Sequence, residues 1–193
     1  MFNTAFNLPN LITWFRILLI PLIVGVYYLP DTWLGMEGKN IAATAMFVFA
    51  AVTDWLDGYL ARVLNQMSAF GAFLDPVADK LIVVGALIML LQLGRVEAAI
   101  GLVIIGREIA ISALREWMAK IGRAKSVAVA FVGKVKTATQ MVAVPLLLYD
   151  GMLFGVLDCH WLGTILIYIA AVLTVISMLY YLRQAMPHAG AAG

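Results

Sequence analysis

Six long apolar segments constrain the fold of this chain more than any other feature of its sequence. Each has about the 20 mostly apolar residues that a helix needs to cross a bilayer, and glycine, proline or aspartate separates one from the next. No alternating β pattern appears, and a spanning segment must satisfy its own backbone hydrogen bonds. We therefore expect an all-α membrane protein with six transmembrane helices, preceded by a short N-terminal interfacial helix at 2–8. The expected spans are 11–29, 41–60, 72–93, 98–118, 127–149 and 161–182.

The composition supports a membrane protein. Of the 193 residues, 64% are hydrophobic and only 12% are charged, whereas a soluble domain has roughly 25% charged residues. The length fits one bundle, so we expect a single transmembrane domain at 1–186 and a disordered Ala/Gly-rich tail at 187–193. The single cysteine, Cys159, excludes an internal disulfide, and no Cys/His cluster suggests a zinc site.

The basic residues indicate the orientation of the helices. With six spans both termini lie on the same side of the membrane, and the opposite loops hold only Lys39 and Arg95 as basic residues. The positive-inside rule therefore predicts that both termini are cytoplasmic. The basic residues on the side of the termini are Arg16, Arg62, Arg115, Lys120, Arg123, Lys125, Lys134, Lys136 and Arg183.

Four aspartates, Asp54, Asp57, Asp75 and Asp79, lie inside or beside the second and third apolar segments. Carboxylates in such places are costly unless they are paired or bind a metal. Spacings of three and four residues place each pair on one helix face, and the topology brings both pairs to the cytoplasmic side. Oxygen ligands favour a hard ion such as Mg²⁺ or Mn²⁺, and two such ions suit displacement at phosphorus. A cation transporter that uses the acids as a pathway is the alternative.

Small residues accompany the aspartates. Gly58, Ala61 and Gly71 leave room for a ligand to approach the backbone, and Arg62 can neutralise a phosphate. The alternative is that the small residues only allow close packing of helices.

A second group of charged residues lies farther along the chain. Arg107 and Glu108 are in the middle of the fourth apolar segment, where buried charges usually mark a site. Several cations on the cytoplasmic half can converge on one anion, which a phosphorylated alcohol would supply. Lys120, Arg123 and Lys125 instead suit contacts with lipid headgroups. The candidate anion-binding residues are Lys80, Arg107, Arg115, Lys134 and Lys136.

The stretch from Asp54 to Asp79 resembles the signature of the CDP-alcohol phosphatidyltransferase family. It reads Asp54-x2-Asp57-Gly58-x2-Ala61-Arg62-x8-Gly71-x3-Asp75-x3-Asp79, and every position and spacing agrees. The resemblance implies that the four aspartates hold two divalent ions, Mg²⁺ or Mn²⁺. It also implies that Asp79 is the general base for the attacking alcohol, although the residues alone leave open which acid takes the proton.

The same resemblance implies the residues that bind CDP-diacylglycerol. These are Gly58, Ala61, Arg62 and Gly71, with Asn10, Thr13 and Arg16 near the nucleotide-lipid site. Asn10 and Thr13 have an alternative role as N-terminal caps of the first helix.

The similarity runs from about residue 6 to residue 183, through the blocks 7–16, 107–117 and 133–137. It implies transfer of a phosphatidyl group from CDP-diacylglycerol to sn-glycerol 3-phosphate in phospholipid biosynthesis, giving phosphatidylglycerol phosphate and CMP. The cations would then bind the acceptor phosphate. It further implies a homodimer, surrounded by membrane lipid, in the bacterial cytoplasmic (inner) membrane. The active site would face the cytoplasm, and no nucleic-acid partner is expected. The alternatives are another alcohol, such as serine or inositol, and the less favoured cation transporter.

Overall fold

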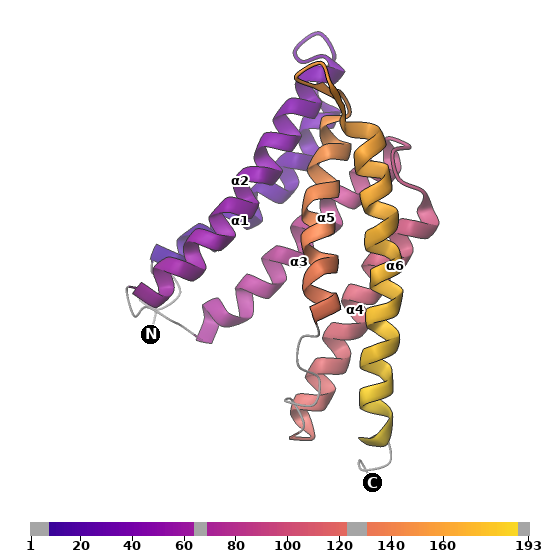
Figure 1. Ribbon diagram of the computed structural model, residues 1–193. Coiled ribbons are helices and arrows are strands. Elements are labelled where there is room, and N and C mark those ends of the chain that lie inside the picture. Colours follow the sequence, from indigo (N-terminus) through magenta and orange to yellow (C-terminus); the bar gives the residue numbers. More distant parts are fainter. Residues whose placement is uncertain (1–7, 64–68, 123–130, 189–193) are drawn as a thin grey trace.

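The computed structural model describes residues 8–63, 69–122 and 131–188, and within them the chain forms six α-helices (Figure 1). The all-α prediction is confirmed, and each helix coincides with one predicted apolar segment. The interfacial stretch lies outside the described residues, apart from Leu8. The helices are α1 (Leu8–Gly25), α2 (Met36–Val63), α3 (Ala69–Gln92), α4 (Ala98–Lys120), α5 (Phe131–Tyr149) and α6 (Cys159–Ala185).

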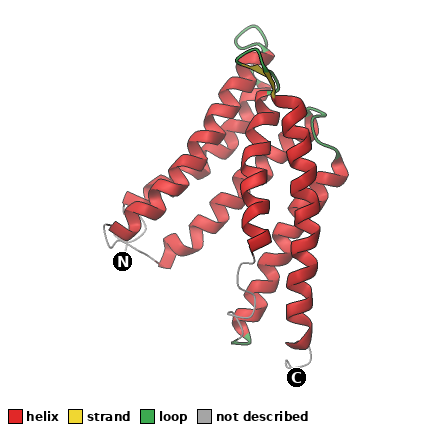
Figure 2. Ribbon diagram, viewed as in Figure 1, coloured by secondary structure: helices red, strands yellow, loops and turns green. Residues whose placement is uncertain are grey.

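Short elements complete the helices (Figure 2). The 3-10 turns η2 (Val26–Tyr28) and η4 (Met186–His188) extend α1 and α6. The turn η4 includes the first two residues of the predicted tail, and 189–193 lie outside the described residues. Two-residue strands, β1 (Met152–Leu153) and β2 (Leu157–Asp158), form an antiparallel hairpin before α6, and strands this short leave no alternating pattern in a sequence.

The helices form two groups of three. α1 packs against α2 and α3, and α6 packs against α4 and α5, while α2 and α5 join the two groups. In Figure 1 the groups are close together at the end with the hairpin, and they diverge toward the end where α1 begins and α6 ends.

Close contacts hold α5 against α6. Gly163 in α6 faces α5, and a Cβ atom at this position would lie 2.8 Å from Leu147 Cγ. Leu147 is fully buried in the main core cluster, together with Phe47 and Leu87. The absence of a side chain at Gly163 therefore allows the two helices to approach each other.

Arg95 joins the two groups at the end where they are close. Its Nε atom lies 3.0 Å from Asp150 Oδ2, and its Nη2 donates to Asn40 Oδ1 in α2 at 2.9 Å. Its Nη1 donates to the carbonyl oxygens of Leu147 and Leu148, at 3.1 and 2.9 Å. These carbonyls are near the C-terminal end of α5, where the helix itself provides no donors. One guanidinium therefore connects α2, α5 and the loop before α4.

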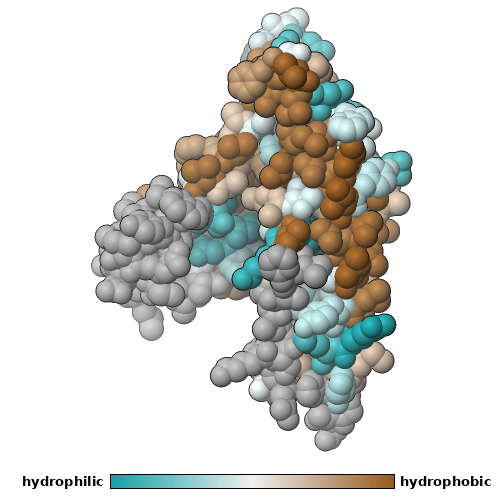
Figure 3. Space-filling model, in the orientation of Figure 1, coloured by the Kyte–Doolittle hydropathy of each residue, from teal (hydrophilic) through white to brown (hydrophobic). Residues whose placement is uncertain are grey.

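The outer surface of the bundle is apolar, with at least one large exposed apolar side chain on every described helix. Figure 3 shows such side chains over much of one face. Two segments, Asn10–Tyr28 and Cys159–Ala185, also have the length and hydropathy of a membrane span. The other helices carry charged residues within their length, such as Asp79 in α3 and Arg107 in α4. Exposed examples on the six helices are Leu18, Val52, Phe73, Leu102, Val142 and Val172.

Candidate functional site

A cavity of about 380 Å³ lies between the two helix groups, and both groups contribute polar side chains to it. In Figure 3 hydrophilic side chains are visible in the hollow between the groups. The polar residues that line the cavity are Arg16, Asp54, Asp79 and Lys80 from α1–α3, and Glu108, Lys136, Thr137 and Gln140 from α4 and α5. Predicted acids and predicted cations therefore share one cavity.

Two of the predicted aspartates converge on Arg16 of α1. The Arg16 side chain is 1% exposed, and its Nη1 donates to Asp54 Oδ1 at 2.7 Å and also to Asp79 Oδ1. Asp75, one turn before Asp79, accepts a hydrogen bond from Thr13 Oγ1 at 2.7 Å. Nothing in the sequence pattern assigned Arg16 to the acids. The feature that could have identified Arg16 was the spacing of three between Asn10, Thr13 and Arg16. This spacing places polar residues along one side of an apolar helix.

The atoms at this wall of the cavity fit a hard divalent ion. Asp54 and Asp79 lie close enough to share one cationic nitrogen atom, and their side chains remain 42% and 45% exposed. Their ligand atoms are oxygens, which Mg²⁺ and Mn²⁺ prefer. Among the side chains that the structure describes, no group of three or more Asp, Glu, His or Cys residues could hold a metal ion. The side chain of Asp57 is not one of those described. Metal binding by Asp54, Asp57, Asp75 and Asp79 therefore stays a prediction.

The predicted CDP-diacylglycerol ligands are only partly described. α2 continues to Val63, so Gly58, Ala61 and Arg62 are on the same helix as Asp54, but the side chains of 55–63 lie outside the described ones. Gly71 is buried near the start of α3. Asn10 and Thr13 are buried within α1, so neither is its N-terminal cap, and that alternative is wrong.

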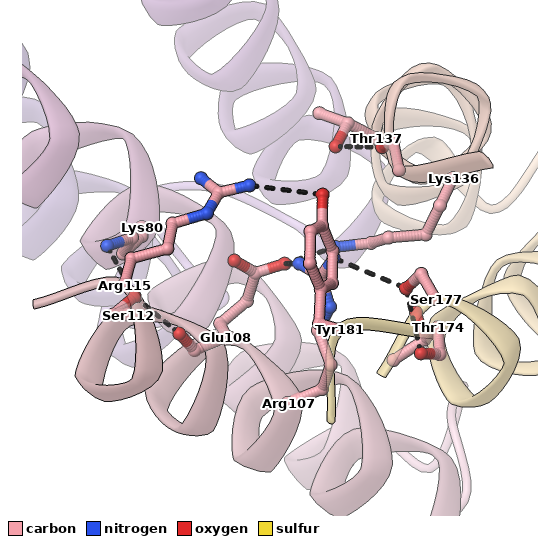
Figure 4. A network of polar contacts seen from close by, with 11 residues as sticks. Lys80, Arg107, Glu108, Ser112, Arg115, Lys136, Thr137, Thr174, Ser177 and Tyr181 are labelled. Carbon is pink, nitrogen blue, oxygen red and sulfur yellow. Dashed lines mark hydrogen bonds and ion pairs between the residues drawn. The ribbon is translucent and has the colours of Figure 1, made fainter. Parts of the chain in front are cut away.

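The opposite wall contains an ion-pair network centred on Glu108 (Figure 4). Glu108 Oε1 accepts hydrogen bonds from Lys136 Nζ and from Arg107 Nη1, the latter at 3.1 Å. The Lys136 side chain is 1% exposed and that of Arg107 is 8% exposed. Arg107 Nη2 also donates to Ser177 Oγ at 3.2 Å. Two of the predicted anion-binding cations are thus brought together by one carboxylate.

α6 contributes polar residues to this network that the sequence pattern did not identify. Arg115 Nη2 donates to the Tyr181 hydroxyl at 3.2 Å, and the guanidinium carbons of Arg107 and Arg115 lie 5.9 and 5.4 Å from the centre of the Tyr181 ring. These distances allow cation–π interactions. Thr174, Ser177 and Tyr181 recur at helical spacing in an otherwise apolar segment, and this spacing was the available signal.

The remaining two predicted cations differ in their surroundings. Lys80 Nζ donates to Ser112 Oγ at 2.7 Å and so connects α3 with α4. Lys134 is exposed, and its side chain has no polar partner among the described residues. Residues two apart on a helix point about 200° from each other, so Lys134 and Lys136 face different directions. Lys134 is thus not among the residues that line the cavity, and its part in binding an anion stays a prediction.

Comparisons with known proteins show which family the chain resembles. The family described as CDP-alcohol phosphatidyltransferase matches residues 6–176. A protein of Shigella flexneri serotype 5b (strain 8401) is 49% identical over 185 residues, which are 93% of this chain and 95% of the relative. A protein of Escherichia coli (strain K12) has the same identity and coverage. Both relatives are described as CDP-diacylglycerol–glycerol-3-phosphate 3-phosphatidyltransferase.

Proposed function

This chain belongs to the CDP-alcohol phosphatidyltransferase family, and we propose that it transfers a phosphatidyl group from CDP-diacylglycerol to sn-glycerol 3-phosphate. The products are phosphatidylglycerol phosphate and CMP. The observation that carries the proposal is the single cavity in which Asp54 and Asp79 form one wall and Glu108 and Lys136 form another. Transfer from a pyrophosphate to a phosphorylated alcohol needs acidic residues and cations in the same cavity. The two walls must be close enough for one small acceptor molecule to reach both.

The wall formed by α1–α3 suits the nucleotide lipid. Asp54, Asp57, Asp75 and Asp79 would hold two divalent ions, Mg²⁺ or Mn²⁺, which when bound lower the pKa of the attacking hydroxyl and neutralise pyrophosphate charge. Gly58, Ala61, Arg62 and Gly71, with Asn10 and Thr13, would bind the CDP-diacylglycerol headgroup. The acyl chains stay in lipid, against the apolar outer surface of the bundle.

The chemical step is a single displacement at phosphorus. Asp79 accepts the proton of the free primary hydroxyl of glycerol 3-phosphate. The hydroxyl oxygen then bonds to the phosphorus on the diacylglycerol side, while the bond from that phosphorus to the oxygen of CMP breaks and CMP leaves with the electron pair. Arg16 holds Asp54 and Asp79 toward the cavity, which keeps the proton acceptor beside the reacting atoms.

The wall formed by α4 and α5, which both pack against α6, suits the phosphate of the acceptor. Arg107 and Lys136 are deeply buried cations, and such residues in a membrane protein usually face a functional cavity. Arg115 and Lys80 extend the positive charge around them. Arginine and lysine bind phosphate by charge-assisted hydrogen bonds, whereas serine or inositol offers no phosphate to these cations.

The membrane arrangement is part of the proposal. Exposed apolar residues on each described helix support six spans, and the distribution of basic residues supports cytoplasmic termini. The residues of α3 and α5 that line the cavity lie in the first half or the middle of each helix, and both helices begin at the end of the bundle where α1 begins and α6 ends (Figure 1). The cavity would therefore open to the cytoplasm from the bacterial inner membrane. A homodimer is proposed from family resemblance alone.

An acceptor screen tests this function. Purified protein with Mg²⁺ and labelled CDP-diacylglycerol is offered glycerol 3-phosphate, serine, inositol or choline in separate reactions. We expect CMP release and a labelled phospholipid product with glycerol 3-phosphate only. A product with serine or inositol would instead identify another alcohol as the acceptor. Divalent ion flux in proteoliposomes without CMP release would favour the cation transporter.

A further inference from the structure

Glu108 presents one carboxylate oxygen to the cations and leaves the other available. Its Oε1 accepts both hydrogen bonds, from Arg107 and Lys136, and no described residue donates to its Oε2. The side chain is 21% exposed and lines the cavity. In Figure 4 the second oxygen points away from Lys136 and from the Ser177 side of the network. Within the described part of the chain, Glu108 Oε2 is therefore an unused acceptor atom beside the proposed phosphate site.

Contacts from several helices fix the position of this carboxylate. Lys136 reaches it from α5, and Arg107 is itself held by Ser177 of α6. Ser112 Oγ donates to the Glu108 carbonyl oxygen at 2.6 Å and accepts the bond from Lys80 of α3. A polar group whose own position is fixed by such neighbours is organised before the ligand arrives.

We propose that Glu108 Oε2 accepts a hydrogen bond from the secondary hydroxyl of glycerol 3-phosphate, and that Glu108 is a specificity-determining residue for the acceptor. The inference rests on the proposed function. In this acceptor the secondary hydroxyl lies between the phosphate and the attacking primary hydroxyl. Glu108 contacts Arg107 and Lys136, which are assigned to the phosphate, and it lines the same cavity as Asp79, the proposed base.

The charges allow a carboxylate and a phosphate to be neighbours here. Lys80, Arg107, Arg115 and Lys136 together carry four positive charges, against one negative charge on Glu108 and two on the phosphate. The sum remains positive. A hydroxyl that donates to an ionised carboxylate forms a charge-assisted bond, which is stronger than a bond between neutral groups. An analogue without that hydroxyl leaves the polar group unpaired and is strongly disfavoured.

The test compares two acceptors on each protein variant. Glycerol 3-phosphate is measured against the monophosphate of 1,3-propanediol, which lacks only the secondary hydroxyl. For the wild type we expect kcat/KM to favour glycerol 3-phosphate by at least about tenfold. In Glu108→Gln the charge-assisted bond is lost and the preference should fall by about fivefold or more. Glu108→Asp, which keeps the charge but withdraws the oxygen by one methylene, should also reduce the preference.

Glu116→Gln is the matched control, since it makes the same change on the same helix at an exposed residue that pairs with Lys120. It should keep the wild-type preference. Because each preference is a ratio within one preparation, a loss of folded protein cancels. Equal losses with both acceptors in Glu108→Gln, or a wild type without preference, would overturn the inference while leaving the proposed function intact. A wild type that releases CMP only with an unphosphorylated alcohol would overturn the proposed function itself.

Discussion

At the scale of single residues, Asp79 combines the features that a general base needs. It lines the cavity, its side chain is 45% exposed, and Arg16 holds it beside Asp54. We predict that Asp79→Asn lowers CMP release with glycerol 3-phosphate by at least about 100-fold, because an amide cannot accept the hydroxyl proton. Asp31→Asn, in an exposed loop, should retain activity. Near wild-type turnover by Asp79→Asn would assign proton transfer to another group.

Arg16 supplies positive charge to the same acids, and its removal should make the protein depend on a divalent ion. In EDTA we predict a lower unfolding temperature for Arg16→Met than for the wild type, since Asp54 and Asp79 lose their positive partner. Adding Mg²⁺ or Mn²⁺ should raise the unfolding temperature of the variant more than that of the wild type, because a bound ion replaces the missing charge.

Arg183→Met, at an exposed position in the last turn of α6, is the control for both parts of that experiment. It should behave as the wild type does. Equal metal-induced shifts in Arg16→Met and the wild type would contradict an ion at these aspartates. The readout is thermal unfolding, so it does not depend on turnover.

The sequence predicted the acids more fully than it predicted their partners. The aspartates between Asp54 and Asp79 were enough to predict this side of the cavity, because carboxylates are rare in apolar segments. Arg16 and Tyr181 were not assigned as partners of particular residues, since an arginine or a tyrosine in an apolar helix has several common roles. Their partners lie far along the chain, and only the fold shows which are near.

At the scale of elements, α5 provides a matched pair of lysines that face different directions. Lys136 is buried against Glu108, while Lys134 is exposed. We predict that Lys136→Met raises KM for glycerol 3-phosphate by about tenfold or more, because the loss of a charged hydrogen bond costs about 1.5–3 kcal/mol. Lys134→Met should change KM by less than about twofold. Steady-state kinetics at saturating CDP-diacylglycerol measure both.

A large rise in KM for Lys134→Met with none for Lys136→Met would reverse the assignment. KM for CDP-diacylglycerol should remain unchanged in both variants, since Lys136 belongs to the acceptor wall and Lys134 lies outside the residues that line the cavity. The helices themselves could be predicted from the sequence, because long apolar segments separated by helix-breaking residues have few alternatives to a helix. The β1–β2 hairpin was not, since Phe154 and Gly155 turn the chain with positive φ angles of 54° and 70° between two-residue strands.

At the scale of the whole molecule, Arg95 joins the two helix groups at the end opposite the acids. Its side chain is 7% exposed, and its contacts reach Asn40, Asp150 and the last carbonyls of α5. We predict that Arg95→Met destabilises the protein by about 3 kcal/mol, because Asp150 Oδ2 and the buried carbonyls of Leu147 and Leu148 lose their donor. For a chain of this size this lowers the unfolding temperature by roughly 6–12 °C. Thermal unfolding in detergent, with Arg183→Met as control, measures it, and an unchanged temperature would contradict this role.

The grouping of the helices into two sets could not be predicted from the sequence. In a membrane protein the faces toward lipid and toward other helices are both apolar, so hydropathy does not say which helices are neighbours. Exposed Leu102 and buried Ile104 in α4 are chemically similar residues in the same segment. The polar residues gave the better guide, since two of the predicted acids, Asp54 and Asp79, and two of the predicted cations, Lys80 and Lys136, do line one cavity.

The most direct test of the central claim is the stoichiometry of the reaction at that cavity. Purified protein in mixed micelles receives CDP-diacylglycerol and glycerol 3-phosphate labelled in its phosphate, with Mg²⁺ or with EDTA. We predict equal amounts of CMP and of lipid-extractable labelled glycerol phosphate with Mg²⁺, and neither product with EDTA or in Asp79→Asn. CMP release without transfer of the label to lipid would show that the cavity does not join the two substrates.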